Sequence, residues 1–175
     1  IDPDVAYFLG LVIARGTIIP ASESHGVNQI IIEFPYVNLT AEGITTSFDQ
    51  QSAIRLALLD TRERLLELLD ADISLVNRSG GVDFVIRFLR NNMIWRNILL
   101  LTGGKTNHYN FTIPEIILSL GLPTDIKREF VRGYADVGGN IRHANRYVDG
   151  KHRVRLDILN ANWDLPVQLC LLIQE

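Results

Sequence analysis

Residues 130–139, FVRGYADVGG, decide the fold of this chain. The segment reads as a buried helix, yet Gly133 stands in its middle and Gly138 and Gly139 close it. A glycine inside a helix costs about 1 kcal/mol relative to alanine, so Gly133 needs a structural reason. Small residues allow two helix backbones to approach closely. We therefore expect a second helix to cross this one at Gly133.

A second copy of the segment lies near the start of the chain. Placing YFLGLVIARGTI (7–18) over FVRGYADVGGNI (130–141) aligns Gly10 with Gly133, Gly16 with Gly139 and Ile18 with Ile141. Both copies read as helices that end in glycine and enter a strand. The repeat predicts a symmetric helix pair whose interface motif consists of Gly10, Gly16, Gly133 and Gly139.

The composition is that of a chain able to bury a substantial core. It has 175 residues, 47% of them hydrophobic, and a single cysteine, Cys170. No signal peptide and no apolar run of membrane-spanning length is present, and a lone cysteine fits a reducing compartment. We expect an intracellular protein. Because the chain begins at Ile1 and stops within an apolar run, we also expect it to be a piece of a longer protein.

Helical and strand-like signals alternate along the chain, which predicts a mixed α+β fold. A helix is expected from Asp2-Pro3 to Gly16, because aspartate caps helices and proline suits their first turn. The Arg-Ser-Gly-Gly sequence at 78–81 indicates a hairpin. The further expected elements are strands at 29–37, 140–144 and 152–159, and helices at 52–70, 92–101, 113–120, 125–138 and from about 162.

The two glycine segments resemble the signature of the LAGLIDADG homing endonucleases. The resemblance extends to RVRLDIL (153–159) and the residues after it, so it covers nearly the whole chain. It implies a LAGLIDADG-type α+β fold of two pseudo-symmetric αββαββα-like halves with saddle-shaped antiparallel sheets. The halves would be residues 1–121 and 122–175, the second without its final hairpin and helix.

The positions that carry the family's chemistry have changed in this chain. The resemblance implies one metal-binding acid just before the last glycine of each signature helix, and those positions hold Arg15 and Gly138. Neither can ligate a hard divalent cation, so we expect no metal, no other cofactor and no catalytic residue. Asp136 lies on another face of its helix and is interpreted as a cap or a surface charge. Arg15 suits a phosphate or is a plain surface residue.

Basic residues gather in one region of a mildly acidic chain. Residues 1–124 carry 9 basic and 13 acidic side chains, whereas residues 140–155 carry five basic side chains against Asp149 alone. Strand alternation places Arg153 and Arg155 on one face and apolar residues on the other. Such a face could read bases while nearby cations bind phosphates. The residues expected to bind DNA are Arg15, Arg87, Arg142, Arg146, Lys151, Arg153 and Arg155.

Together these features predict sequence-specific binding of double-stranded DNA through a β-sheet saddle in the major groove, without nuclease activity. The chain would be the target-recognition domain of a larger regulator or restriction-type protein, with further domains of the same chain as possible partners and no membrane. Three alternatives stay open. They are an RNA maturase that assists intron splicing, an active homing endonuclease with acids from unexpected positions, and a protein-interaction module, which the acidic first 124 residues favour.

Overall fold

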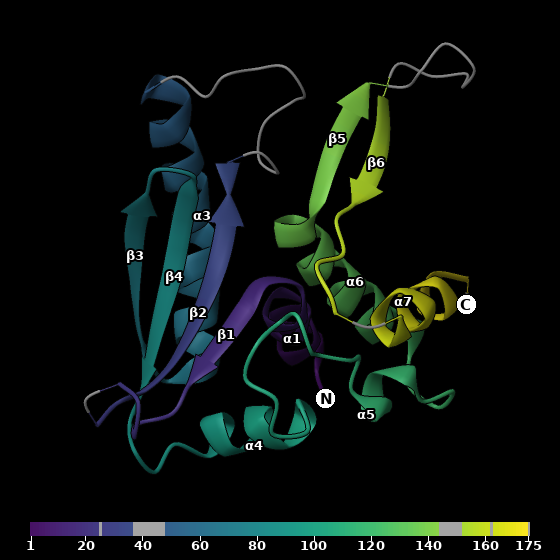
Figure 1. Cartoon of the computed structure of the whole chain (residues 1–175), viewed down its shortest axis with the longest axis horizontal. Helices are drawn as coiled ribbons and strands as arrows, with labels where there is room; N and C mark the ends of the chain where they lie inside the picture. Colours follow the sequence, from purple (N-terminus) through teal and green to yellow (C-terminus); the bar gives the residue numbers. More distant parts are fainter. Residues whose placement is uncertain (25, 37–47, 144–151, 162, 175) are drawn as a thin grey trace.

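The computed structural model describes the chain except residues 25, 37–47, 144–151, 162 and 175 (Figure 1). Two helices, α1 and α6, lie side by side near the middle of the molecule, with a four-stranded sheet on one side of them and a two-stranded ladder on the other. The elements in chain order are α1 (Pro3–Arg15), β1 (Gly16–Ile19), β2 (Asn28–Pro35), α3 (Phe48–Leu69), β3 (Asp72–Arg78), β4 (Gly81–Phe88), α4 (Met93–Leu101), α5 (Glu115–Leu118), α6 (Thr124–Gly138), β5 (Gly139–His143), β6 (His152–Leu156) and α7 (Asp164–Gln174).

Helix α1 begins and ends where its sequence predicts. The Asp2 side chain accepts a hydrogen bond of 2.9 Å from the backbone N–H of Val5, and Pro3 occupies the first turn. Every residue from Ala6 to Arg15 is buried. An apolar side chain is therefore needed on all sides of this helix, which explains its nearly uninterrupted apolar sequence.

Helices α1 and α6 meet backbone to backbone at their central glycines. A Cβ atom built on Gly10 would stand 2.1 Å from the carbonyl oxygen of Phe130. One built on Gly133 would stand 2.0 Å from the carbonyl oxygen of Tyr7. No side chain fits at these distances, so the contact requires glycine at both positions.

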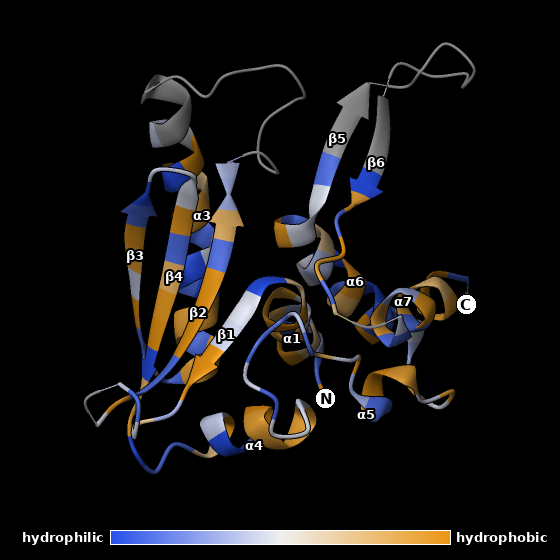
Figure 2. Cartoon of the chain, viewed as in Figure 1, coloured by the Kyte–Doolittle hydropathy of each residue, from blue (hydrophilic) through white to orange (hydrophobic). Residues whose placement is uncertain are grey.

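The four-stranded sheet is antiparallel with the strand order β1-β2-β4-β3. Its inner face carries the core residues of the two central strands, and apolar positions predominate in both (Figure 2). These core residues are Ile30, Ile32, Phe34, Val82, Phe84, Ile86 and Phe88. The register pairs Glu33 with Asp83, and both lie at alternate positions to the core residues. Their side chains therefore belong to the outer face of the sheet.

The second sheet is the ladder of β5 and β6. Its register pairs Arg142 with Arg153 and Asn140 with Arg155. Helix α7 follows β6 and buries Leu165, Leu169 and Leu172. Within the described ranges, no helix has both the length and the apolar character needed to cross a membrane.

The expected α+β class is confirmed, and most expected elements are present. One expected strand, 152–159, is too long, because β6 ends at Leu156. The N–H of Asp157 still donates to the carbonyl oxygen of Gly138 at 2.6 Å, next to the last pair of the ladder. Further along, the Asn160 amide donates to Phe111 O at 2.8 Å and the N–H of Ala161 donates to Tyr109 O at 2.6 Å. These later contacts hold the backbone against residues 109–111 before α7 begins.

Candidate nucleic-acid interface

The ends of α1 and α6 hold no carboxylate at the two positions of interest. Arg15 is the last residue of α1 and retains 9% of its surface exposed. A Cβ atom on Gly138, the last residue of α6, would stand 3.2 Å from Cε1 of Tyr134 and 3.3 Å from the carbonyl oxygen of Asp157. The ring of Tyr134 thus lies against the space that a side chain at position 138 would need.

Two buried aromatic residues accompany Arg15 at this end of the helix pair. The His108 ring approaches the carbonyl oxygen of Gly16 through Nδ1 at 3.2 Å, and the His108 backbone N–H donates to the same oxygen at 3.0 Å. Tyr134 is fully buried, and burial raises the pKa of its hydroxyl to about 12 although Arg15 acts in the opposite direction. The phenol is therefore neutral at physiological pH.

The proton of His108 can be placed from these contacts. A carbonyl oxygen only accepts hydrogen bonds, so Nδ1 carries the proton and Nε2 is an acceptor. Burial lowers the pKa of His108 below its ordinary value of 6.5, and the charge of Arg15 adds to this effect. The ring is therefore neutral in the folded protein near pH 7.

His108 should make the stability of the folded protein dependent on pH. Because its pKa is lower when folded, the unfolded chain binds the proton first as the pH falls below 6.5. The free energy of unfolding should then decrease as the pH is lowered from about 7 to about 5.5. Urea unfolding of the wild type and of His108→Gln across this range measures the effect. The variant should show a shallower dependence, and equal slopes would contradict the prediction.

Asp136 is exposed, as the expected surface charge would be, and it also has a partner that the sequence did not predict. Its carboxylate accepts a 2.8 Å hydrogen bond from the buried hydroxyl of Tyr7. The guanidinium groups of Arg64 and Arg132 lie 4.5 Å and 4.8 Å from the centre of the Tyr7 ring. Burial, followed by the charge of Asp136, raises the pKa of Tyr7 well above its ordinary range. The hydrogen bond between Asp136 and Tyr7 thus helps to stabilise the contact between α6 and α1.

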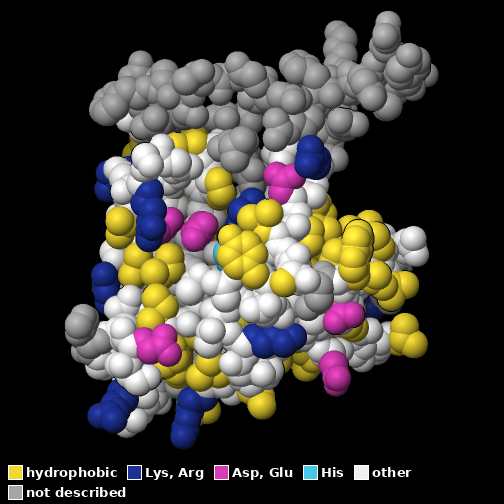
Figure 3. All heavy atoms as spheres, viewed as in Figure 1, with side chains coloured by type: hydrophobic (Ala, Val, Ile, Leu, Met, Phe, Trp, Pro, Cys, Tyr) yellow, Lys and Arg dark blue, Asp and Glu magenta, His cyan; other side chains and the backbone are white. Residues whose placement is uncertain are grey.

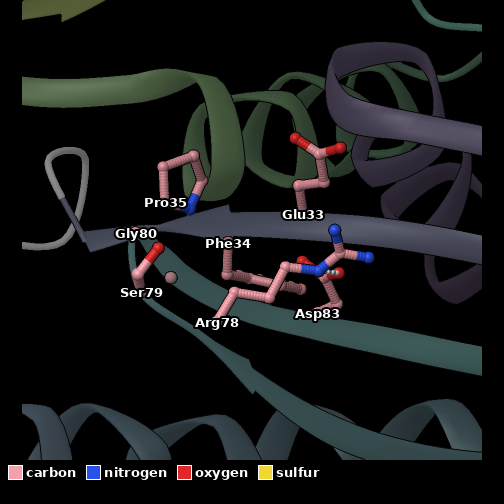
Figure 4. Close-up of a pocket in the computed structure, with 8 residues that line it drawn as sticks. Glu33, Phe34, Pro35, Arg78, Ser79, Gly80 and Asp83 are labelled. Atoms are coloured by element: carbon pink, nitrogen blue, oxygen red, sulfur yellow. Dashed lines mark ion pairs between the residues drawn. The ribbon is translucent and has the colours of Figure 1, made fainter.

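A polar pocket lies on the outer face of the four-stranded sheet (Figure 4). Glu33 and Asp83 line it from β2 and β4, and Arg78 reaches over it to form an ion pair with Asp83. The side chain of Asp83 is only 4% exposed. Burial raises the pKa of Asp83, Arg78 lowers it and Glu33 raises it. Two carboxylates and one guanidinium thus give this face an acidic centre.

This outer face is less open than strand alternation predicted. Asp83, Val85 and Arg87 alternate with the core residues as expected, but Asp83 and Val85 are buried. Arg87 is partly exposed and binds Asp72 at 3.1 Å and Ser74 at 2.8 Å. Of the candidate DNA-binding residues, Arg87 therefore lies near the end of the central strand β4 and has a carboxylate partner.

The second sheet holds the other candidate residues only in part. Arg155 is exposed and forms a 3.0 Å ion pair with Asp157, which also accepts a 2.7 Å hydrogen bond from the Asn140 amide. Arg142 and Arg153 are described by their backbone pairing. Arg146 and Lys151 lie outside the described residues.

The surface in Figure 3 mixes charges of both signs with hydrophobic side chains, and no large uniform basic area is visible on this face. Among the described residues, no group of three or more His, Cys, Asp and Glu side chains could hold a metal ion. Tyr134 and His108 had no sequence signal as site residues. They are identified as candidate site residues only by the structure, which places both near the end of α1.

No protein-family model matches this sequence, and no curated protein matches it. Solved structures of I-DmoI, a LAGLIDADG homing endonuclease, do resemble the chain. A variant of I-DmoI in complex with its target DNA and with manganese shares 14% identity, with a TM-score of 0.46, over 79% of this chain and 61% of that chain.

I-DmoI in complex with DNA and manganese gives 14% identity and a TM-score of 0.40, over 79% of this chain and 63% of the other. A further variant with magnesium gives 11% identity and a TM-score of 0.39, over 79% and 62%. The chain therefore spans less than two thirds of each of these proteins. In fold it is similar to a LAGLIDADG homing endonuclease, the family that its repeated glycine motif resembles.

Proposed function

We propose that this chain binds double-stranded DNA in a sequence-specific manner and does not cut it. The structural feature that supports DNA binding is the two-stranded ribbon of β5 and β6. Its register places Arg142 opposite Arg153, and Arg155 is exposed two pairs further along, opposite Asn140. A two-stranded antiparallel ribbon fits the major groove, where arginine binds the O6 and N7 atoms of guanine. The positive balance of residues 140–155 adds attraction to phosphates.

The residue chemistry at the helix ends supports binding without cleavage. Arg15 and Gly138 stand where the family resemblance implies the metal-binding acids, and neither offers an oxygen ligand from its side chain. As part of the same proposal, residues 1–121 and 122–175 act as two halves of a recognition unit. That unit would serve a larger intracellular protein, either a regulator or a restriction-type protein.

A second candidate function is a protein-interaction module. The sheet of the first half favours it, because Glu33 and the buried Asp83 place carboxylates on its outer face, where they would repel phosphates. Residues 1–124 also carry four more acidic than basic side chains, 13 against 9. A basic protein partner would suit this surface better than DNA would.

Binding measurements on the whole chain separate these functions. Fluorescence anisotropy should be recorded with random-sequence duplex DNA, duplexes selected from a random pool and structured RNA, each over a salt series with and without Mg²⁺. The proposal expects the selected duplex to bind at least ten-fold more tightly than random duplex, with a steep dependence on salt. It also expects no product strand after incubation with Mg²⁺.

Each other outcome identifies a different function. Preference for structured RNA would point to an intron maturase, and strand breaks that require Mg²⁺ would contradict the absence of cleavage. If no nucleic acid binds even at low salt, the DNA-binding proposal is wrong and the interaction module takes its place.

A further inference from the structure

Residues 106–113, part of the segment between α4 and α5, lie against the outer edge of β1 (Figure 1). Strand β1 is at the edge of the four-stranded sheet, where its outer backbone groups need partners. The N–H of Ile18 donates to the carbonyl oxygen of Thr106 at 2.7 Å. The N–H of His108 donates to the carbonyl oxygen of Gly16 at 3.0 Å. We call residues 106–113 the strap.

The strap also binds the part of the chain that follows the ribbon of β5 and β6. The side-chain amide of Asn160 donates to the carbonyl oxygen of His108 at 3.2 Å and to that of Phe111 at 2.8 Å. The N–H of Ala161 donates to the carbonyl oxygen of Tyr109 at 2.6 Å. Asn160 thus uses both hydrogens of its amide on the strap. These bonds connect the strap to the chain just beyond β6.

Burial and a bond to α7 fix the far end of the strap. Phe111 and Ile113 are both buried, and the N–H of Ile113 donates to the side-chain oxygen of Gln168 at 2.8 Å. His108 has contacts on both sides, because its N–H binds β1 while its carbonyl oxygen accepts from Asn160. Covering the edge of β1 would need only the first of these contacts. The strap therefore joins the four-stranded sheet to the chain that follows the ribbon.

We propose that the strap holds the ribbon at a fixed distance from the four-stranded sheet, and that Asn160 is a positioning residue for DNA recognition. The part that concerns DNA rests on the proposed function. The close contact of α1 and α6 is centred on Gly10 and Gly133, and an attachment away from this crossing opposes rotation about it. Gly16 provides that attachment on β1, about 9 Å further along the axis of α1.

A fixed distance between two DNA-binding surfaces determines the length of the DNA site that fits both. Once one surface is bound, freedom between the two lowers the effective concentration of the second. A preorganised pair also avoids the cost of ordering on binding. The strap should therefore determine which spacing between the two parts of a DNA site is recognised, whereas the bases themselves are recognised by other side chains.

The distance can be measured without DNA. Cys170 is exposed on α7, and Val76 is exposed on β3, so Val76→Cys adds a second labelling site on the four-stranded sheet. Pulsed electron paramagnetic resonance between spin labels at the two sites should give a narrow distance distribution. Asn160→Ala should broaden this distribution, because two carbonyl oxygens of the strap lose their donor. The matched control is Asn97→Ala, which removes an exposed asparagine of α4 and should leave the distribution unchanged.

DNA binding tests the positioning role. Asn160→Ala should bind the selected duplex about 10-fold more weakly than the wild type, but should bind each half of that duplex within about two-fold of the wild type. A single base pair inserted at the centre of the duplex should weaken the wild type by more than about ten-fold and the variant much less. Asn160→Asp keeps the size of the side chain but replaces the donor with an acceptor, so it should behave as Asn160→Ala does.

The outcomes separate the strap from the proposed function. Coinciding distance distributions for Asn160→Ala and the wild type would overturn the inference. Equal relative losses on full and half duplexes would overturn the positioning role, because a merely structural defect lowers every affinity alike. If the wild type binds no DNA while Asn160→Ala broadens the distribution, the proposed function fails and the fixed distance stands. Gln168→Ala removes a different bond of the strap, so it should also broaden the distribution and replaces Asn160→Ala if that variant does not fold.

Discussion

Gly133→Ala is expected to destabilise the protein by about 3 kcal/mol or more, and Gly10→Ala should act similarly. The added methyl group would stand 2.0 Å from the carbonyl oxygen of Tyr7, or 2.1 Å from that of Phe130 in Gly10→Ala. These contacts are with backbone atoms, which cannot rotate away, so α1 and α6 must separate. Urea unfolding followed by circular dichroism measures the loss. Alanine also has a higher helix propensity than glycine, by about 1 kcal/mol, and the expected destabilisation of about 3 kcal/mol already takes this gain into account.

Gly121→Ala is the matched control for the two helix-pair variants. A Cβ atom there has only the Ser119 hydroxyl oxygen near it, at 3.8 Å, which is ordinary van der Waals contact. Its stability should stay within about 0.5 kcal/mol of the wild type. A Gly133→Ala protein as stable as this control would show that the two helices do not meet as closely as described.

The double substitution of Arg153 and Arg155 by alanine should weaken DNA binding by about 100-fold or more. Arg155 is exposed, and the register of β5 and β6 puts both positions on the same face of the ribbon. A well-placed bidentate arginine contributes about 1–3 kcal/mol of discrimination between bases. Anisotropy with a selected duplex and with random duplex measures both affinity and specificity. The ratio between the two affinities should fall together with the affinity.

The matched control for this pair is Arg90→Ala with Arg96→Ala. Both of these arginines are exposed and belong to the region around α4, away from the ribbon. The control removes the same charge, so only the general attraction to DNA is reduced. Its affinity for DNA should therefore fall by less than about five-fold. Equal losses in both double variants would refute the assignment of the ribbon face. Melting temperatures should be similar, because exposed arginines contribute little to stability.

The helix pair could be predicted from the sequence because its signal is local. A glycine at an energetically unfavourable position, found twice with the same flanking pattern, points to a close backbone contact, and Gly10 and Gly133 lie where the structure brings α1 and α6 together. Capping residues such as Asp2 likewise act within one turn of the helix. Such interactions produce recognisable patterns among neighbouring residues, and these patterns can be identified from alternation or spacing in the sequence.

The surroundings of the helix ends could not be predicted, because they depend on contacts between distant segments. His108 reaches Gly16 across 92 residues, and no spacing rule links a histidine to a carbonyl oxygen so far away. Alternation placed Asp83 on the outer face correctly but could not show that Arg78 and the neighbouring strand enclose it. The same holds for Asp136, whose partner Tyr7 lies in the other half of the chain.

Tyr134 has a consequence for the ways in which this protein can change. A Cβ atom at position 138 would stand 3.2 Å from Cε1 of the Tyr134 ring, while the Tyr134 backbone nitrogen lies 2.7 Å from the Cβ position of Gly10. A side chain at 138 would therefore require the Tyr134 ring to shift by a few tenths of an ångström, while the helix contact holds the Tyr134 backbone in place. Positions 134 and 138 are therefore expected to change together rather than one at a time.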